Sequence, residues 1–560
     1  MATAERLEAR GHDPGEVFNQ PPPLKQEDLF GDDRALVEAV AREDGDWAAP
    51  RLHQLGRLAA SDEAIAWGIQ ANAHPPVLRT HDRFGHRIDE VEFHPAWHRL
   101  LEVAVEHAVH ALPWREPTPG AHVARAAAFY LLAQVEAGHG CPISMTHAIV
   151  PALRSEPALA AEWVPGLTSL GYEPGLRPPA DKRGLLAGMG MTERQGGSDV
   201  RANTTRADPV ATGGPGGEYV LTGHKWFCSA PMSDVFLVLA QAPQGLSCFL
   251  LPRVLPDGAL NGFHIQRLKD KLGNRSNASS EVEFHGAWAR LVGEPGRGIR
   301  TILEMVNHTR LDCVVGSAAG MRQAVVQAIH HAAHRRAFGR LLIDQPLMRN
   351  VLADLALESE AATALGLRLA GAFDRAGANP QEAAFRRLAT AVGKFWVCKR
   401  GGVVVGEALE CLGGNGYVEE STMPRLYREM PLNAIWEGSG NVIALDALRA
   451  MAREPETAEA FHDELLLAKG EDNRYDAALT AFEARRGEDE AEGEAQARRV
   501  VEWMALLLQA SLLIRHSPHE LASAFCAGRL DPRRGLAFGT LPAGCDLGAI
   551  INRSGPLSQP

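Results

Sequence analysis

The spacing of apolar residues changes character twice along the chain, and this pattern limits the folds that are open to it. From about residue 48 to residue 164, apolar residues recur every three or four positions, as in helices. Short alternating runs between Gly, Pro and Asp turns follow over residues 185–284 and indicate strands. Helical spacing then returns in three long Ala-rich segments, at residues 301–336, 345–376 and 381–412. The chain is therefore predicted to be mainly α with a central β-domain.

These changes divide the chain into five expected parts. A length of 560 residues and a hydrophobic fraction of 45% leave room for several domains with large cores. The parts are a turn-rich N-terminal extension, an N-terminal helical domain, a middle β-domain, a C-terminal helical bundle and an extra helical region, at residues 1–47, 48–184, 185–290, 291–450 and 451–560.

The expected strands follow one another without helices between them, so the pattern is not βαβ. They are predicted at residues 218–222, 235–239, 247–251 and 281–284. A dinucleotide fingerprint is also missing, because Glu193 stands where the third glycine after Gly188 and Gly190 would be. The chain has no Walker A, His-Glu-x-x-His or Gly-x-Ser-x-Gly motif.

Charge and cysteine spacing narrow the class further. The chain has 57 Lys and Arg against 69 Asp and Glu, a net charge of −12, so it lacks the overall basic footprint of a non-specific nucleic-acid binder. None of its 8 cysteines stands at CxxC spacing, which favours buried thiols over a zinc or disulfide framework. The start, residues 1–16, is charged and has no apolar segment of a signal peptide. We expect a cytoplasmic protein with no membrane span and no metal site.

Two polar motifs lie in the expected β-domain. The decapeptide MTERQGGSDV at residues 191–200 offers backbone N–H groups and the Ser198 hydroxyl, which suit a phosphate or the polar edge of a ring. On local sequence alone, a polar turn is the alternative interpretation. The run KWFCS at residues 225–229 sets aromatic rings beside a hydroxyl at a strand end. Such rings flank a planar cofactor or belong to a core.

Two further motifs belong to the helical bundle. RRAFG at residues 335–339 ends a helix, where arginines bind phosphate or simply complement the helix dipole. IWEGSGN at residues 435–441 sets Glu437 among apolar residues and glycines. Loss of water would raise the pKa of Glu437 towards that of a general base. Alternatively, Glu437 caps the helix that follows.

In this order and at these separations, the four motifs resemble the acyl-CoA dehydrogenase superfamily, and in particular its AidB-like, adaptive-response branch. Further matching runs are FNQP, FHPAW, QVEAG, LKDKLGNRSNAS and PRLYREMP, at residues 18–21, 93–97, 134–138, 268–279 and 424–431. The resemblance covers almost the whole chain. It implies an N-terminal helical domain, a middle β-barrel domain, a C-terminal four-helix bundle and the extra C-terminal helical domain of the branch.

The resemblance also implies FAD as cofactor, held between the last two family domains and across a subunit interface. In one subunit the matching positions are Met191, Thr192, Gly197, Ser198, Phe227, Ser229, Ser439 and Asn441. Arg335 and Phe338 match residues that reach the FAD of a neighbouring subunit, and Gly413 and Gly414 match the loop beneath it. A shared cofactor implies a homo-oligomer, with a dimer of dimers (a homotetramer) as the family pattern.

Glu437 matches the catalytic base of the family. Some relatives carry the base on an earlier helix, just before an arginine, and here Thr309 before Arg310 occupies that place. A hydroxyl cannot replace a carboxylate base, so Glu437 is the candidate that remains. By resemblance, Glu437 removes the α-proton of an acyl-CoA while a hydride leaves the β-carbon for flavin N5, and Arg310 contacts the substrate.

Two functions of different classes follow from the resemblance. One is a FAD-dependent acyl-CoA dehydrogenase. The other is a stress flavoprotein that binds double-stranded DNA and limits alkylation damage with little or no turnover. A folded flavoprotein scaffold without turnover is a third, plainer alternative. DNA affinity rests largely on Lys and Arg at the phosphates, and the net charge of −12 opposes it. The arginine pairs that could still cluster start at Arg335, Arg386, Arg498 and Arg533.

Overall fold

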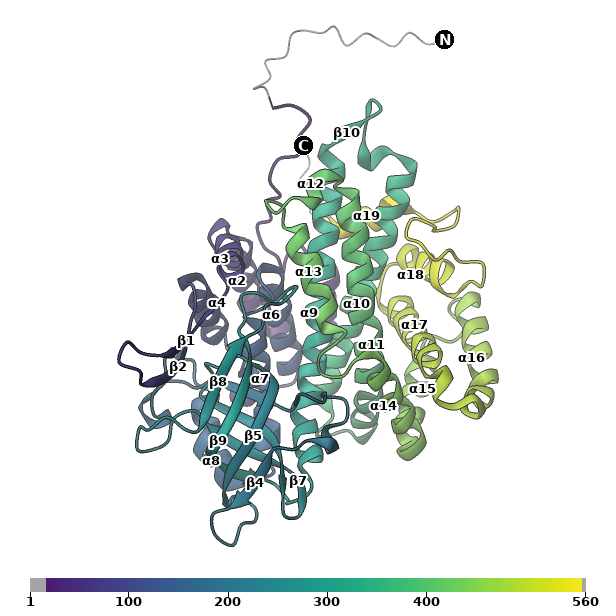
Figure 1. Cartoon of the computed structure of the whole chain (residues 1–560). Helices are drawn as coiled ribbons and strands as arrows, with labels where there is room; N and C mark the ends of the chain where they lie inside the picture. The colour runs from purple at the N-terminus through teal and green to yellow at the C-terminus, as the bar shows by residue number, and fades with distance from the viewer. Residues whose placement is uncertain (1–16, 556–560) are drawn as a thin grey trace, which may run out of the picture.

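The computed structural model describes residues 17–555, apart from the side chains of residues 485–492. The charged start on which the expectation of no signal peptide rests, residues 1–16, lies outside the described residues. Figure 1 shows an N-terminal helical part and a β-domain on one side of a bundle of long helices, with the C-terminal helices on its other side. This arrangement is the predicted one, mainly α with a central β-domain. None of the described helices is long and apolar enough to cross a membrane.

The N-terminal part is built around one fully enclosed helix, α6. Every residue of α6 except Ala133 is buried, which explains why its sequence is apolar on all sides. Residues 17–47, the described part of the extension predicted at residues 1–47, pack into the same core through Phe30 and Leu36. The helices are α1 (Arg34–Arg42), α2 (Ala49–Ala60), α3 (Asp62–Ala73), α4 (Pro95–Glu106), α5 (Leu112–Arg115), α6 (Ala121–Val135), α7 (Gly140–Leu153) and α8 (Pro157–Leu167).

A hairpin interrupts the region that was predicted to be helical throughout. Its strands are β1 (Val77–His81) and β2 (Arg87–Glu92), which pair antiparallel. The Asp82 side chain accepts hydrogen bonds from the amides of Phe84 and His86 and so reverses the chain. The hairpin is short and mostly exposed, which is why apolar periodicity does not reveal it.

The β-domain is a small closed barrel. Its strands are β3 (Ala187–Gly190), β4 (Arg206–Pro209), β5 (Glu218–Ser229), β6 (Val235–Ala242), β7 (Gly245–Pro252), β8 (Phe263–Leu268) and β9 (Ser279–Val292). The order β3-β6-β4-β5-β9-β7 closes through pairing of β6 with β7, and β8 pairs with β9. Phe236 and Phe249 fill the barrel, whereas Leu237 and Leu250 face the helices. Burial on both faces explains why β6 and β7 read as unbroken apolar runs.

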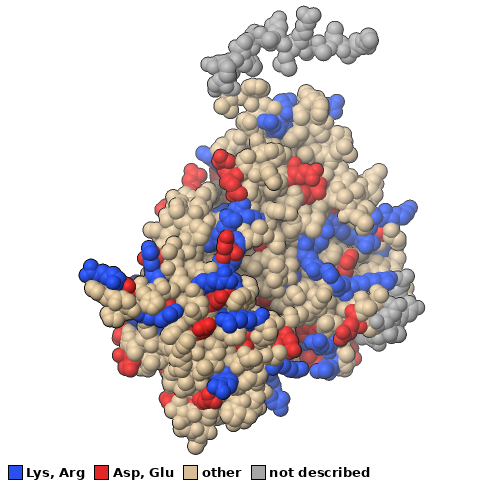
Figure 2. Space-filling model, viewed as in Figure 1, with Lys and Arg blue, Asp and Glu red and all other residues tan. Residues whose placement is uncertain are grey.

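Three long helices form the frame of the bundle: α9 (Gly298–His334), α10 (Pro346–Arg375) and α11 (Pro380–Cys411). The shorter elements around them are the hairpin β10 (Arg336–Ala337) and β11 (Arg340–Leu341), and the helices α12 (Gly414–Tyr417), α13 (Met423–Asn433) and α14 (Gly440–Arg453). All three long helices begin no more than about three residues from their predicted starts, because their amphipathic pattern is long and unbroken. Acidic and basic side chains are mixed over the face seen in Figure 2.

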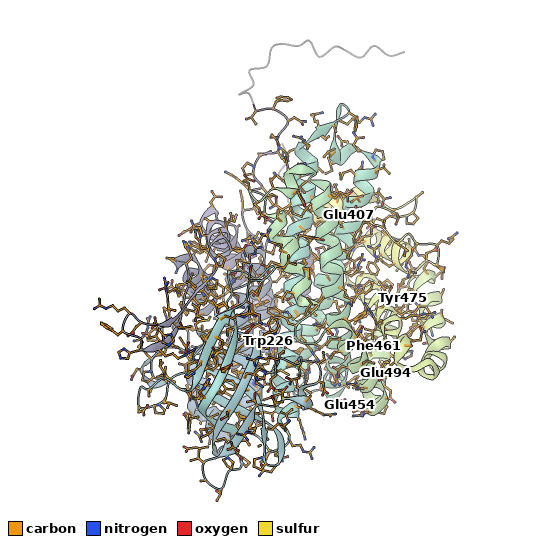
Figure 3. The ribbon with its side chains drawn as sticks, viewed as in Figure 1. Trp226, Glu407, Glu454, Phe461, Tyr475 and Glu494 are labelled. Atoms are coloured by element: carbon orange, nitrogen blue, oxygen red, sulfur yellow. The ribbon has the colours of Figure 1, made fainter. Side chains whose placement is uncertain are left out.

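The C-terminal region shares the core of the bundle and has no separate core of its own. Its helices are α15 (Pro455–Leu466), α16 (Asn473–Glu492), α17 (Ala497–His516), α18 (His519–Phe525) and α19 (Leu547–Ser554). Phe461, labelled in Figure 3, stacks on Phe385 of α11 with ring centroids 6.1 Å apart. Arg368 of α10 is also ion-paired with Glu464 at 2.8 Å. The region predicted at residues 451–560 is therefore part of the bundle's packing.

Candidate active site

A cavity of about 1040 Å³ opens between the barrel, the N-terminal helices and the bundle. Its walls come from α7, the loop after β3, the end of β5, α9, α13 and the residues before α14. Trp226, labelled in Figure 3, lies at this boundary at the end of β5. The volume is at the upper end of the range of ligand pockets, roughly 300–1,000 Å³, so the site can hold a large cofactor.

A buried ion pair shapes the loop after β3. The Glu193 carboxylate accepts a hydrogen bond from Lys225 Nζ at 2.9 Å and others from the amides of Thr204 and Thr205. Both charged side chains have no exposed surface. Burial acts to raise the pKa of Glu193, but Lys225 and the hydrogen bonds outweigh it and lower the pKa to about 2. The ionised pair therefore fixes the loop from both ends.

The fixed loop presents four of the predicted cofactor residues to the cavity: Met191, Thr192, Gly197 and Ser198. Gly197 lies so close to Thr192 that a Cβ atom would stand 2.4 Å from Thr192 Oγ1. Only glycine fits there. Phe227 and Ser229 also line the cavity, with Phe227 49% exposed and Ser229 Oγ 3.2 Å from Ser279 Oγ, and the neighbouring Trp226 amide donates to the Thr192 carbonyl at 2.8 Å. Motifs that are distant in sequence thus meet across one cavity.

Glu437 faces the same cavity in a constrained backbone conformation. Its φ is +57°, in the left-handed region that side chains rarely adopt. The Arg310 guanidinium donates to the Glu437 carbonyl at 3.0 Å, and Lys394 Nζ donates to the carbonyls of Trp436 and Gly438 on either side. The backbone hydrogen bonds on both sides of Glu437 thus hold this conformation.

The Glu437 carboxylate is directed at α9 and does not cap α14. Its Oε2 atom lies 2.8 Å from Thr309 Oγ1, whereas the residue at the helix cap is Ser439, which lines the cavity. Burial raises the pKa of Glu437, and the Thr309 hydrogen bond opposes this rise. Of the two sequence interpretations, the structure therefore fits the general base better than the cap.

Arg310 borders the cavity but is held by protein groups. Its side chain is 8% exposed and pairs with Asp446 at 2.9 Å, and Arg387 binds the other Asp446 oxygen at 2.9 Å. The guanidinium is therefore placed behind Glu437, where it supports the backbone of that residue. A direct contact between Arg310 and a substrate stays a prediction.

Sequence reasoning missed a charged group deeper in the cavity. Glu136 accepts hydrogen bonds from the His139 amide at 2.9 Å and from Ser276 Oγ at 2.7 Å, and His139 Nδ1 lies 3.3 Å from its carboxylate. Burial acts to raise the pKa of Glu136, but the His139 side chain, the His139 amide and Ser276 outweigh it and lower the pKa to about 2. Burial and the nearby Glu136 charge raise the pKa of Glu429 to about 7. Glu136, Ser276 and Glu429 lie in the runs QVEAG, LKDKLGNRSNAS and PRLYREMP. The sequence therefore shows these residues, but it does not show that they lie close together in the fold.

The comparisons with known proteins agree with this architecture. Residues 19–174 match the adaptive response protein AidB N-terminal domain, residues 188–287 the acyl-CoA dehydrogenase middle domain, and residues 296–452 the acyl-CoA dehydrogenase C-terminal domain. AidB of Escherichia coli K12 is 48% identical over 93% of this chain and 95% of its own length. The chain belongs to the acyl-CoA dehydrogenase family. The predicted AidB-like membership within that family is confirmed.

Two comparisons with nematode proteins extend the likeness. The acyl-CoA dehydrogenase family member 11 of Caenorhabditis elegans is 31% identical over 78% of this chain and 72% of its own length. The crystal structure of ACDH-11 from the same organism, in complex with C11-CoA, superposes with a TM-score of 0.84 at 28% identity and covers 95% of both chains. The fold of this acyl-CoA dehydrogenase relative therefore extends through the C-terminal helices.

The structure does not bring the remaining predicted residues to the cavity of this chain. Arg335, Phe338, Gly413 and Gly414 belong to the far end of the bundle, where the labels β10 and α12 stand in Figure 1. Asn441 is exposed in the first turn of α14 and does not line the cavity. For the first four, the family resemblance placed them at the cofactor of a neighbouring subunit, and a position outside this chain's own cavity agrees with that expectation.

The N-terminal motif FNQP organises that far end. Asn19 exchanges two hydrogen bonds with the backbone of Arg336, at 2.8 and 3.0 Å, and its carbonyl accepts a bond from Arg335. Gln20 Oε1 accepts a hydrogen bond from Asn415 at 2.9 Å. One short segment thus links the β10–β11 hairpin to the loop at residues 413–416.

Proposed function

We propose that the chain is a FAD-dependent acyl-CoA dehydrogenase in which Glu437 is the catalytic base. The observation that carries the proposal is the placement of Glu437. Its carboxylate faces a large cavity, its pKa is raised by burial, and backbone hydrogen bonds from Arg310 and Lys394 hold it in a left-handed conformation. Such strain is typical of functional sites.

The residues that face the cavity fit FAD. The 191–198 loop offers hydroxyl groups and exposed backbone, and the Phe227 ring and the Ser229 hydroxyl also line the cavity. Buried donors also lack protein partners there, namely Gln134 Nε2 and Arg425 Nη1. The residues that hold FAD in this proposal are Met191, Thr192, Gly197, Ser198, Phe227, Ser229, Ser439 and Asn441. When bound, FAD supplies the acceptor for the hydride that leaves the substrate β-carbon.

Side chains of the protein accept the substrate proton and position the group that accepts it. Glu437 accepts the α-proton of the acyl-CoA, because a carboxylate with a raised pKa is a stronger base than an exposed one. The Thr309 hydroxyl donates to this carboxylate at 2.8 Å and keeps it ionised and aimed. An acyl-CoA thioester is the substrate class, in line with the C11-CoA bound by ACDH-11.

A second copy of the chain completes the cofactor site in this proposal. Arg335, Phe338, Gly413 and Gly414 reach the FAD of a neighbouring subunit, and the assembly is a dimer of dimers. Phe338 is 99% exposed and Tyr417 is 80% exposed at this end of the bundle. Large apolar side chains this exposed on one face mark an interaction site.

The test is an anaerobic titration of the purified yellow protein with a series of acyl-CoA esters, followed by flavin absorbance. The wild type bleaches with at least one ester. Glu437→Gln retains FAD and loses this reduction by about 10²–10⁴-fold, the usual contribution of a general base. Glu420→Gln, which removes the same charge at an exposed position, reduces like the wild type. Bleaching of Glu437→Gln at the wild-type rate contradicts the assignment.

A second candidate function, binding of double-stranded DNA, is favoured by one local patch. Basic side chains gather over α11 and α17, on the right of Figure 2. Lys399 and Arg498 both lie over the Phe395 ring, at 5.3 and 5.9 Å, and Arg499 lies beside them in sequence. Among the described side chains, none of these three has an acidic ion-pair partner. Cations that have no acidic partner among the described side chains suit phosphates, despite the overall charge of −12.

Gel retardation of duplex DNA at two salt concentrations tests this second function. Three phosphate contacts would weaken binding about 40-fold between 50 and 200 mM salt. The double variant Arg498→Ala/Arg499→Ala binds more weakly and with a flatter salt dependence. The matched control is Arg533→Ala/Arg534→Ala, which removes the same charge from another exposed pair. No retardation at the lower salt concentration eliminates this function.

A further inference from the structure

Three histidines from three different helices meet behind the cavity. His122 belongs to α6, His147 to α7 and His308 to α9, and one ring nitrogen of each lies within 4.8 Å of the others. All three side chains are buried: the residues are 8%, 1% and 5% exposed. The Trp114 ring covers the group, with its centroid 4.9 Å from that of His147 in a stacked arrangement.

The Nδ1 atom of each of these histidines is buried and has no hydrogen-bond partner. Leaving a buried polar atom unpaired costs about 1–3 kcal/mol, and three such atoms in one cluster are unusual for a core. Burial, followed by nearby positive charges, lowers the pKa of His122 to about 3 and holds the other two pKa values well below 6.5. The imidazoles are therefore neutral at pH 7, and each has a free lone pair.

We propose that His122, His147 and His308 bind one divalent transition-metal ion of the zinc type. Neutral imidazole nitrogen is a preferred ligand of zinc, and three histidines with an open fourth position form a known coordination pattern. Zinc–nitrogen bonds of about 2.0–2.1 Å in a tetrahedral arrangement place the nitrogens about 3.3 Å apart. The observed separation of up to 4.8 Å needs an inward shift of about 1 Å, within reach of small side-chain rotations.

The charges around the cluster indicate which cations it accepts. Arg125 is paired with Asp312 through two hydrogen bonds, while Arg154 lies over Trp114 and Arg386 over Phe373, both at 4.8 Å. A hard cation such as Mg²⁺, which relies on oxygen ligands, is disfavoured beside these arginines. A metal that forms bonds to nitrogen is not excluded by them.

Asp374 of α10 places a carboxylate beside the cluster. Its carboxylate accepts hydrogen bonds from the backbone amides of His122 and Val123, at 2.9 and 3.1 Å. It thus lies beside one ligand residue without competing for the imidazole nitrogens. With Asp374 ionised, part of the ion's charge is balanced inside the protein.

The position of the cluster gives the ion a structural role. It joins α6 and α7 of the N-terminal part to α9 of the bundle. His308 immediately precedes Thr309, whose hydroxyl lies 2.8 Å from the Glu437 carboxylate. Metal binding therefore fixes the part of α9 that faces the base, and it needs no part in the chemistry of the cavity.

Metal analysis of the full-length protein tests the proposal directly. The protein is loaded with Zn²⁺, dialysed against metal-free buffer and analysed by mass spectrometry, and Co²⁺ is loaded in parallel for its visible absorption bands. We expect one ion per chain, a tetrahedral nitrogen-ligated Co²⁺ spectrum and a higher melting temperature with Zn²⁺. His147→Gln and His308→Gln lose the ion while their circular dichroism is unchanged.

A surface histidine pair provides the matched control. His330 and His334 lie one turn apart at the end of α9, with ring centroids 4.4 Å apart, and such pairs can collect metal adventitiously. His330→Gln/His334→Gln retains the ion if the proposal is correct. Should the cluster variants fail to fold, zinc-edge anomalous diffraction from wild-type crystals locates the ion directly. No retained metal, loss of metal in the control variant, or an anomalous peak away from the three imidazoles overturns the proposal.

Discussion

Replacement of Lys225 by methionine is the most informative perturbation of the site. The change keeps an unbranched side chain, one heavy atom shorter, and removes its charge. The Glu193 carboxylate is then left buried, with 0% of its side chain exposed, and without its cationic partner. The carbonyl of Leu239, which accepts from Lys225 Nζ at 2.8 Å, also loses its donor.

The contacts that remain set the size of the effect. Breaking a buried ion pair costs about 3–5 kcal/mol. Glu193 keeps the Thr204 and Thr205 amides and the Thr204 hydroxyl, which places the loss towards the lower end, and the orphaned carbonyl adds about 1 kcal/mol. We therefore expect about 4 kcal/mol of local destabilisation. Because the strands and the 191–198 loop share this pair, FAD content falls as well.

Hydrogen exchange measures this loss better than global melting, because a chain with several packed regions does not unfold in two states. A loss of about 4 kcal/mol reduces protection of the amides in residues 191–205 by roughly a thousand-fold, unless global unfolding sets a lower limit. Arg51→Met is the control. It breaks an exposed ion pair with Glu116 at 3.0 Å and costs about 1 kcal/mol or less.

A double-mutant cycle decides whether the ion pair is responsible. Glu193→Gln and Glu193→Gln/Lys225→Met complete the cycle, and two residues in direct contact should show a coupling of at least about 2 kcal/mol. In the double variant no buried charge is left unpaired, so protection recovers in large part. Additive effects of the two single changes would refute the reasoning.

Three further predictions follow from the same contacts. Thr309→Val removes the hydrogen bond that lowers the pKa of Glu437, so the pH profile of flavin reduction by acyl-CoA moves to higher pH while acyl-CoA binding is unchanged; an unshifted profile argues against a role for the hydroxyl. The pKa of Glu429 is about 7 in the folded chain against 4.5 in the unfolded chain, so its contribution to stability is present below pH 4.5 and is lost as the pH rises to 7. Glu429→Gln removes this loss of about 3 kcal/mol, which is measured as a smaller fall in melting temperature between pH 5 and pH 8. Parallel melting profiles of the variant and the wild type contradict this prediction. Asn19→Ala removes two hydrogen bonds to Arg336, so exchange of amides at residues 335–341 accelerates and the oligomer weakens at low protein concentration; unchanged exchange would show that the FNQP segment does not hold the hairpin.

Local pattern accounts for the long elements of the fold and misses the short exposed ones. Helix α9 extends over 37 residues, and its pattern alone places it. The β1–β2 hairpin has strands of 5 and 6 residues with little burial, so its alternation is too brief to stand out from the helices around it. Closure of the barrel through the pairing of β6 with β7 also cannot be predicted from the pattern of apolar residues, because that pattern does not specify which strands pair.

The candidate site shows the same division between local and long-range information. Three of the four motifs, at residues 191–200, 225–229 and 435–441, carry residues that line the cavity, but no spacing rule links Glu193 to Lys225, which are 32 residues apart. His122, His147 and His308 each read as a lone histidine in an apolar helix. Their meeting requires three helices to be packed first, so the expectation of no metal site rested on cysteine spacing alone.

The backbone, more than the side chain, decides what Glu437 can do. A left-handed φ at a residue other than glycine costs roughly 1–2 kcal/mol, and here Arg310 and Lys394 stabilise it through the carbonyls of residues 436–438. Asp446 in turn holds Arg310 at 2.9 Å, so Glu437 is oriented by an ion pair that never contacts its carboxylate. A glutamate in an ordinary helical turn at this point would follow the direction of α14 and serve as a cap. The sequence IWEGSGN therefore left two interpretations open because the deciding contacts come from α9 and α11.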